Sequence, residues 1–324
     1  MSKKKLILLT LLTIVSISAI ISGVWATKQM IALQNERTKI YKSGDKTVEA
    51  FSSNINNDSK EELPGINPQI DKTQKLINDF ATAYVEYNFI NANEVIDKNL
   101  IKNWLIIEKD NVSLDKQKVQ EYVDGLAQKY DTVGSERQFV DSHGKTVTVS
   151  GGPYGWQIDC EKETNELIDI ITQGKNVTGR EPIYKQKATT RGVNDIGNTY
   201  VEVNMSEQKM WFYKDGELIV STNIVTGNTN RGHGTPSLVG YIHNKVRNIN
   251  LVGQGYVAFV HYWMKVYGSI GIHDASWRNK FGGSIYTTNG SHGCINTPIN
   301  NVKEIYDNIE VGTPVVIFYE DDDK

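Results

Sequence analysis

The sequence predicts a mainly β domain in the C-terminal part of the chain, a sandwich with one C-terminal helix, preceded by a small α+β domain. Apolar and polar residues alternate over 200–203, and a second strand pattern covers 209–213, as in half-buried strands. The turn residues Asp215-Gly216 lead from that strand into a further apolar run, which is a strong hairpin signal. Only one later segment has convincing helical spacing, with apolar residues Val302, Ile305, Tyr306 and Ile309 before Gly312.

The other strands of this domain are expected at apolar runs that follow the hairpin. These runs cover 217–225, 238–243, 256–266, 270–273 and 315–318. Together they indicate a sandwich or a partly closed sheet over residues 198–320.

The preceding domain, over 71–186, mixes both periodicities. Helical spacing occurs at Leu76, Phe80 and Tyr84, and again at Val119, Tyr122, Val123 and Leu126. Short strands are expected over 140–149 and 156–158, with the turn residues 151–155 between them. A last helix over 164–171 ends at Gly174.

The N-terminus has the pattern of a membrane segment. Lys3-Lys4-Lys5 precedes an uncharged stretch from Leu6 to Ala26 that is long enough to cross a bilayer. The lysines place the N-terminal end in the cytoplasm and the remaining chain outside. Val24-Trp25-Ala26 also fits a signal-peptidase site, but the apolar stretch is longer than a usual signal-peptide core. We therefore expect an uncleaved transmembrane anchor over 1–27 and a polar stalk over 28–70.

Composition excludes some classes of function. The formal net charge of −3 and the isoelectric point near 6.1 give no basic field for a nucleic acid. The two cysteines, Cys160 and Cys294, lie in different predicted domains, so no disulfide is expected. Cys160 has the pattern of a small buried residue.

Cys294 has a different setting, which indicates a catalytic nucleophile. It follows His292 and Gly293, and His273 lies 21 residues earlier at the end of an apolar run. A histidine mounted on a strand can take the thiol proton and later return it to a leaving amine. Gly293 allows a turn whose backbone N–H groups face a developing oxyanion. The alternative is a zinc site that uses His261 as a fourth ligand, but the spacing matches no usual zinc pattern.

These residues carry a family resemblance. His273-Asp274 followed by Ser291-His292-Gly293-Cys294-Ile295-Asn296-Thr297 resembles the signature of the L,D-transpeptidases, the YkuD-type cysteine enzymes of bacterial cell walls. Segments 204–213, 234–240 and 261–264 resemble other parts of that domain, and the likeness spans about 200–319. Segment 150–159 resembles the signature of a peptidoglycan-binding domain that often precedes it, although a spacer without a ligand stays open for 71–186.

The resemblance implies a YkuD-like β-sandwich and a cysteine L,D-transpeptidase that makes 3→3 peptidoglycan cross-links. Cys294 would attack the third residue of a donor tetrapeptide stem and form a thioester, which the amine of an acceptor stem then opens. His273 is implied as base, with His292 in support and the amides of Gly293 and Cys294 as oxyanion donors. The implied substrate-binding residues are Ser291, Asn296, Asp274, Tyr262, Trp263 and Met264.

Several points stay open at this stage. Many family members carry Arg where this chain has Asn296, which leaves the partner of the substrate carboxylate undefined. Asp274 either orients His273 or is solvated. Segment 276–290 has the glycines of a mobile flap, and its Arg278 and Lys280 either meet substrate carboxylates or form an exposed basic loop.

The same residues also suit an L,D-carboxypeptidase, in which water replaces the acceptor amine. A wall-binding protein with an incidental cysteine is the alternative outside enzymes. No cofactor and no metal is expected. The expected partners are peptidoglycan stem peptides and, through the N-terminal helix, the cell membrane, with the catalytic domain on the wall side. The resemblance also implies a role in cell-wall synthesis and cell shape, and makes carbapenems the expected inhibitors.

Overall fold

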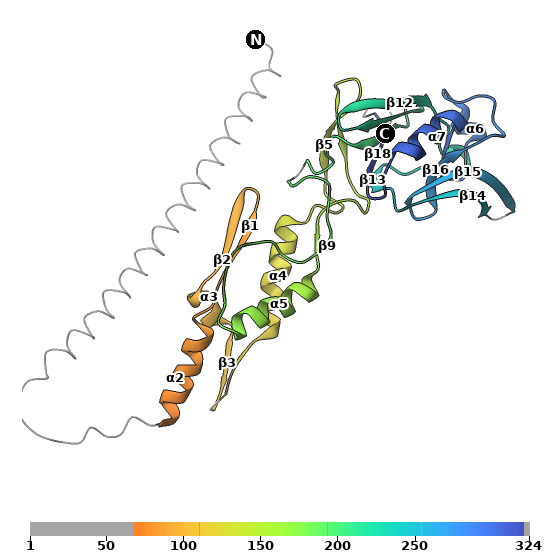
Figure 1. Ribbon diagram of the computed structural model, residues 1–324. Coiled ribbons are helices and arrows are strands. Elements are labelled where there is room, and N and C mark those ends of the chain that lie inside the picture. The colour runs from red at the N-terminus through yellow and green to blue at the C-terminus, as the bar shows by residue number, and fades with distance from the viewer. Residues whose placement is uncertain (1–67, 110, 193, 254, 321–324) are drawn as a thin grey trace, which may run out of the picture. The chain divides into compact units, whose positions relative to one another are not determined.

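The computed structural model describes residues 68–109, 111–192, 194–253 and 255–320, which belong to one compact unit (Figure 1). The expected membrane anchor and residues 28–67 of the expected stalk lie outside the described residues. Residues 68–70, counted above with the stalk, already belong to the first described helix. Within the described ranges, none of the helices has the length and apolar character needed to span a membrane.

The first described region is an α+β domain, as expected. Strand β1 lies at the centre of a three-stranded sheet, antiparallel to β2 and parallel to β8. Helices α4 and α5 pack side by side (Figure 1). The elements of this region are α2 Pro68–Phe80, β1 Tyr84–Phe89, β2 Ala92–Ile96, α3 Lys98–Asn103, β3 Leu105–Glu108, β4 Asn111–Leu114, α4 Lys116–Tyr130, α5 Cys160–Thr172 and β8 Asn176–Arg180.

Local sequence explains where these helices begin. Asp97, Asp115 and Asp159 each precede a helix and accept hydrogen bonds from backbone N–H groups of its first turn. The apolar stripe of α4 is buried, as its spacing predicts. The extension of the first helical pattern to Tyr84 is wrong, because α2 ends at Phe80 and Tyr84 starts β1. Strands β1, β2, β3, β4 and β8 were not expected.

A buried carboxylate ties α5 to this sheet. Glu163 is fully buried and accepts hydrogen bonds from the Tyr87 hydroxyl and, at 2.7 Å, from the Ile183 N–H. Arg180 forms an ion pair with it at 2.8 Å. Burial raises the pKa of the Glu163 carboxyl, and these partners oppose that rise. The carboxylate therefore joins β1, β8 and the segment after β8 at one point.

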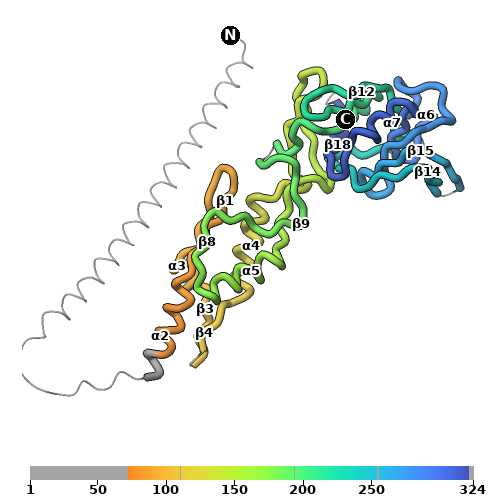
Figure 2. The backbone as a smooth tube through the Cα atoms, in the orientation of Figure 1, coloured from red at the N-terminus to blue at the C-terminus, as the bar shows by residue number. Residues whose placement is uncertain are grey.

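The hairpin that follows α4 packs on the C-terminal domain instead. Strands β5 (Arg137–Val140) and β6 (Thr146–Val149) pair with each other. Phe139, Val147 and Val149 share an apolar cluster with residues of the C-terminal sheet. Ser142, in the turn, donates to the buried Glu202 carboxylate at 2.6 Å. In Figure 2 this yellow-green segment runs beside the C-terminal sheet. Its core contacts therefore differ from those expected for the interior of the 71–186 domain.

The segment 151–155 forms the second half of this attachment. Val239 N–H donates to the Gly151 carbonyl, and Tyr154 N–H donates to the Val239 carbonyl, at 3.2 Å in both cases. A Cβ on Gly152 would lie 2.3 Å from the Val239 oxygen, so only glycine fits there. The chain then passes through β7 (Gln157–Ile158), which pairs with β9 (Tyr184–Gln186). This segment, which resembles a ligand-binding signature, thus contacts the C-terminal sheet.

The C-terminal region is mainly β, which confirms the expected class. Its five-stranded sheet has the order β12-β11-β10-β18-β13, and its four-stranded sheet the order β14-β15-β16-β17. The bounds are β10 Tyr200–Asn204, β11 Lys209–Lys214, β12 Glu217–Asn223, β13 Leu238–Tyr241, β14 Asn244–Gly253, β15 Tyr256–Tyr267, β16 Ile270–Asp274, β17 Ile295–Thr297 and β18 Pro314–Phe318. Side chains of both sheets meet in one core that includes Val203, Phe212, Met264, Ile272 and Ile317.

Two details of this region differ from expectation. The one helix that the sequence predicts is α7, Ile299–Asn308. The described part of the domain also contains a 3₁₀ turn, η1 Thr229–Arg231, and a second short helix, α6 Ile285–Asn289. Strands β14 and β17 were not predicted. β17 has only three residues, and β14 has mostly exposed or half-buried residues, so neither has a clear apolar alternation.

Candidate active site

The site is built on two parallel strands, near the end of β16 and the start of β17. β16 and β17 pair in parallel with His273 opposite Asn296, and Cys294 directly precedes β17. The hairpin of β14 and β15 supplies the facing wall. The resulting pocket has a volume of about 490 Å³ and is lined by Leu251, Tyr256, Val257, Ala258, Phe259, His273, Trp277, Arg278, Gly290, Ser291, His292, Cys294 and Asn296. The folded chain therefore brings His273, His292, Ser291, Asn296 and Cys294 to one cavity.

The turn that carries the cysteine is braced by hydroxyl groups. Ser291 Oγ donates to the Cys294 carbonyl at 2.6 Å and accepts from the Gly293 N–H at 3.0 Å. Thr235 Oγ1 donates to the Gly293 carbonyl at 2.7 Å. Gly293 has a φ of 118°, which residues with a Cβ rarely adopt. Ser291 thus shapes the turn, and the Gly293 N–H, expected as an oxyanion donor, is bound within it.

The Cys294 thiol is partly exposed at the pocket wall. Its sulfur lies 3.6 Å from the Ser269 carbonyl oxygen. Burial raises the pKa of the Cys294 thiol, and the Gly271 N–H opposes this rise. At neutral pH the resting nucleophile is therefore the thiol, and a base is needed to produce the thiolate.

His273 has the environment of such a base. Its side chain is buried, with 4% of its surface exposed, and burial lowers the pKa of the imidazole, with the carbonyl and carboxylate of Asp274 opposing. His273 Nδ1 lies 2.8 Å from the Asp274 carbonyl oxygen. A carbonyl only accepts, so this contact assigns the proton to Nδ1 and leaves a lone pair on Nε2. The ring is therefore a neutral imidazole with its basic nitrogen defined by the backbone.

Asn296 and Arg278 extend this arrangement. With the Asn296 amide oriented by its neighbours, its nitrogen lies 3.3 Å from His273 Nε2 and its oxygen accepts from Arg278 Nε at 2.7 Å. Burial lowers the pKa of the Arg278 guanidinium, which lines the same pocket. Arg278 therefore holds the orientation of an amide that faces the imidazole. The sequence does not predict this contact, since the alternatives for Arg278 were a substrate carboxylate or an exposed basic loop.

His292 lies among rings instead of beside the imidazole. It stacks on Tyr256 with a centroid distance of 4.7 Å and a 22° interplanar angle, and His233 lies 4.7 Å away at 47°. Tyr256 is the first residue of β15, so the stacking of His292 connects the turn that carries Cys294 to the hairpin wall of the pocket. The pKa of the Tyr256 hydroxyl is raised by burial and by its proximity to Cys294. This position suits a supporting role.

The other expected substrate-binding residues do not line the pocket. Asp274 is fully buried, and its carboxylate accepts from the backbone N–H groups of His261 and Tyr262 at 2.7 and 2.8 Å. Its side chain is therefore not solvated and does not orient His273, whose partner is the Asp274 carbonyl. Met264 lies in the core, because side chains alternate along β15. Tyr262 packs against that core. The ring centroids of Trp263 and His273 are 5.8 Å apart.

His261, weighed above as a metal ligand, does not line the pocket. It instead contacts Asp274 through Nδ1 at 3.0 Å.

Segment 276–290, expected to be a flap, is joined to its surroundings by hydrogen bonds. Gly282 N–H donates to the Ile224 carbonyl at 2.8 Å, and Asn228 Nδ2 donates to the Thr288 carbonyl at 3.0 Å. It contributes Trp277, Arg278 and Gly290 to the pocket. The hairpin residues Tyr256, Val257 and Phe259 were missed. Their signal in the sequence is the apolar run over 256–260, and the structure leaves Val257 of this run 67% exposed.

The Cys160 thiol has a different environment from that of Cys294. Burial, with a hydrogen bond to Asp124, raises the pKa of the Cys160 thiol to about 11. Its sulfur lies 3.9 Å from the Ile158 carbonyl oxygen, at the start of α5. This thiol is a poor nucleophile at neutral pH.

Comparison with known proteins defines the family. A family model described as an L,D-transpeptidase catalytic domain matches residues 198–317, and another, described as a "Putative peptidoglycan binding domain", matches residues 68–178. The crystal structure of a cysteine-to-serine mutant of Enterococcus faecium L,D-transpeptidase is 35% identical, covering 76% of this chain and 100% of that chain with a TM-score of 0.62. The Ldtfm–avibactam carbamoyl enzyme is 36% identical, covering 77% of this chain and 98% of that chain with a TM-score of 0.62.

No curated protein matches this chain. Because a relative at 35% identity is covered over its whole length, the chain belongs to the L,D-transpeptidase family. Its YkuD-type catalytic domain follows the region that matches the "Putative peptidoglycan binding domain". The family is one of enzymes that act on peptidoglycan.

Proposed function

We propose that this protein is a cysteine L,D-transpeptidase that forms 3→3 peptidoglycan cross-links through a thioester on Cys294. The observation that carries the proposal is that Cys294 and His273 line one pocket, where the imidazole is buried and neutral and its Nδ1 proton is bound by a backbone carbonyl. Further support comes from the relative described as an avibactam carbamoyl enzyme, at 36% identity.

In the first half-reaction, His273 Nε2 gives up its contact with the Asn296 amide and takes the thiol proton as the sulfur attacks the carbonyl carbon of the third stem residue. The C–S bond forms and the carbonyl oxygen becomes an oxyanion. The Cys294 N–H is the donor we assign to it, since the Gly293 N–H is bound by Ser291 Oγ. The imidazolium then gives its proton to the leaving D-alanine nitrogen as the C–N bond breaks. The product is a thioester with neutral His273.

In the second half-reaction, the side-chain amine of an acceptor stem attacks the thioester. His273 removes a proton from the attacking nitrogen, and the same proton returns to the departing sulfur. An amide bond replaces the thioester, and the thiol is regenerated. The enzyme therefore needs no cofactor for this cycle.

Transfer to an amine is favoured over hydrolysis by the apolar wall of the pocket. Leu251, Val257 and Phe259 from the hairpin face the turn that carries Cys294. An apolar wall limits ordered water near the thioester, while an acceptor stem can displace water along it. The carboxypeptidase reaction, with water as acceptor, is the second candidate because the catalytic residues are the same.

We also propose that the protein is anchored in the cell membrane by residues 1–27, with the catalytic domain on the wall side. The proposal rests on the lysines before the apolar stretch. Protease added to intact, wall-stripped cells should degrade the domain. Full protection of the domain would overturn this topology.

The test of the function is incubation of the protein with a disaccharide-tetrapeptide, followed by mass spectrometry. A cross-linked dimer that has lost one D-alanine supports the transpeptidase. A trimmed tripeptide without dimer indicates the carboxypeptidase. Unchanged substrate, with equal results for Cys294→Ala, indicates a wall-binding protein without catalysis.

A further inference from the structure

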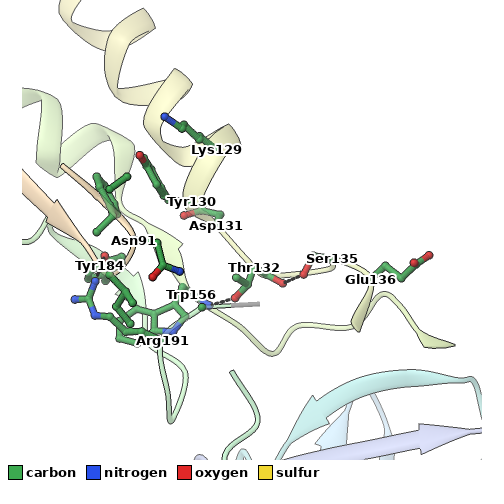
Figure 3. Close-up of a pocket in the computed structure, with 14 residues that line it drawn as sticks. Asn91, Lys129, Tyr130, Asp131, Thr132, Ser135, Glu136, Trp156, Tyr184 and Arg191 are labelled. Carbon is green, nitrogen blue, oxygen red and sulfur yellow. Dashed lines mark hydrogen bonds between the residues drawn. The ribbon is translucent and has the colours of Figure 1, made fainter. Parts of the chain in front are cut away.

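A second cavity, of about 300 Å³, lies in the α+β part of the chain and shares no lining residue with the active-site pocket. Its walls come from the turn between β1 and β2, the end of α4, and the segments around Trp156, Tyr184 and Arg191 (Figure 3). Its volume is at the lower end of the range for ligand pockets, about 300–1,000 Å³, which suits a small unit of a larger molecule.

Aromatic rings form two sides of this cavity. The Tyr130 ring lies flat on Phe89, with centroids 3.6 Å apart and an interplanar angle of 4°. Trp156 and Tyr184 meet at 4.9 Å and 65°. Trp156 Nε1 donates to the Thr190 carbonyl at 2.7 Å, which holds the indole in place. The cavity therefore offers fixed apolar surface to a ligand.

Both aromatic pairs already have a cation near a ring. Lys129 Nζ lies 5.1 Å from the Tyr130 ring centre, and the Arg191 guanidinium lies 4.7 Å from that of Trp156. Each cation is also paired with an acid, Lys129 with Glu94 at 2.6 Å and Arg191 with Glu181. These acids neutralise both cations, so a ligand anion finds no free positive charge here. The carboxylates of Asp131 and Glu136 also line the cavity, and they suit a ligand that donates hydrogen bonds.

The remaining polar groups provide hydrogen-bonding capacity. Asp131 is half-buried and accepts from the Ile158 N–H at 2.9 Å through Oδ1. Burial raises the pKa of its carboxyl. Among the described residues, no ion pair includes Asp131 and no hydrogen bond includes the Asn91 side chain. Figure 3 shows Asn91 between Tyr130 and Trp156. A carboxylate oxygen and a free amide thus face a cavity with aromatic walls.

The floor of the cavity is rigid. Thr132, which follows Asp131, donates to the buried Asp195 carboxylate and accepts from the Trp156 N–H at 2.8 Å. Arg137 is 2% exposed and forms an ion pair with Asp195 at 2.7 Å. One buried network therefore holds Thr132, the neighbour of Asp131, and the backbone of Trp156. The cavity is preformed, so few of its side chains lose freedom when a ligand binds.

We propose that this cavity, the glycan pocket, binds an N-acetylated amino sugar of the peptidoglycan glycan strand. Such a sugar is uncharged at the ring, presents C–H groups that pack on aromatic surface, and carries hydroxyl and acetamido groups. Asp131 accepts the hydroxyls, Asn91 pairs with the acetamido group, and Tyr130 and Tyr184 contact the C–H face. The proposal goes beyond the proposed function, because it concerns no step at Cys294.

The test uses the full-length protein with Cys294→Ala, in detergent, and tetra-N-acetylchitotetraose as the probe. Calorimetry and ligand-observed NMR should show saturable binding. Asp131→Asn keeps an oxygen for the Ile158 N–H and should weaken binding by about tenfold, because a hydrogen bond to a charged group is lost. Asn91→Ala, at an exposed turn, should also weaken it. The control is Glu121→Gln, which changes an exposed acid of α4, the helix that ends just before Asp131, and this variant should bind like the parent.

Three results would overturn the proposal: no binding of the oligosaccharide, equal binding by Asp131→Asn and Glu121→Gln, or binding of a free stem peptide in its place. The last result would assign the cavity to the peptide. Acylation of Cys294 by a soluble tetrapeptide, measured in a chain with only Asp131→Asn, should stay within about twofold of the parent, because no acylation step involves Asp131. Loss of turnover in the parent chain would count against the proposed function and leave the sugar titration valid.

Discussion

The active-site pocket and the glycan pocket both combine aromatic walls with a few polar groups, but they differ in the charge state of those groups. In the active site, burial keeps the thiol protonated and the imidazole neutral, and backbone groups contact both. In the glycan pocket, the cations remain charged and are neutralised by acids outside the cavity. Proton transfer needs neutral partners that can exchange a proton, whereas binding of a sugar needs a fixed acceptor such as the Asp131 carboxylate and no free cation beside it.

The two pockets also differ in how they are supported. His273 and Cys294 are positioned by paired strands and a turn braced by Ser291. Asp131 and Asn91 lie at a helix end and a hairpin turn, over a buried ionic network. Strand pairing gives the close tolerance that catalysis requires. The comparison predicts large effects from the first pocket and moderate effects from the second.

The largest effect is expected at the nucleophile. Cys294→Ser should lose turnover by several orders of magnitude, because an alkoxide is much harder to form than a thiolate at neutral pH. Cys160→Ala is the matched control and should keep activity within about twofold, since its thiol has a pKa of about 11. Turnover is measured with the disaccharide-tetrapeptide. A dead Cys160→Ala beside an active Cys294→Ser would reverse the site assignment.

The base is expected to come next. His273→Ala should slow acylation by about 10²–10⁴-fold, since the thiol must then lose its proton without assistance. Intact mass after carbapenem treatment measures this directly. The parent chain should gain one drug equivalent on the Cys294 peptide, His273→Ala should gain it slowly, and Cys294→Ala should gain none. An adduct on Cys160 or on a serine would remove Cys294 from its role.

The pH dependence of acylation tests whether the His273 imidazole is neutral in the active site. Burial lowers the pKa of His273, so the base stays neutral through the ordinary histidine range near 6.5. The rate should therefore be flat there and fall about tenfold per pH unit only below the lowered pKa. An acid limb at or above 6.5 would contradict a buried neutral imidazole. The rate is followed by stopped-flow acylation with a carbapenem.

The same shift also affects stability. In the window between the lowered folded pKa and the ordinary value, the unfolded chain binds more protons at this histidine than the folded chain. Its contribution to the free energy of unfolding therefore decreases as pH falls through that window.

A smaller effect is expected from the orienting arginine. Arg278→Ala should slow acylation by about three- to tenfold, because Asn296 loses the contact that directs its nitrogen toward His273. Lys280→Ala, an exposed cation of the same segment, is the control. Arg278→Lys should restore little, since one ammonium does not reproduce the guanidinium contacts. If Arg278 instead only binds a substrate carboxylate, KM rises with kcat unchanged.

Sequence alone determined the features that depend on local geometry. Asp215 and Gly216 both have positive φ, as the hairpin between β11 and β12 requires, and Gly293 has the φ that the cysteine turn needs. The class of both domains and the motif residues around Cys294 followed from spacing of this kind. Such signals act over a few residues, so they survive without knowledge of the remaining fold.

Tertiary structure decided which groups each side chain meets. Asp274 adjoins His273 in sequence, yet its carboxylate reaches β15, because successive side chains on a strand point to opposite faces. Asn296 faces His273 only through the parallel register of β16 and β17. Likewise, Asn91, Asp131 and Trp156 form one cavity because three distant segments pack together. Contacts of this kind depend on long-range pairing and burial, which no local pattern in the sequence encodes.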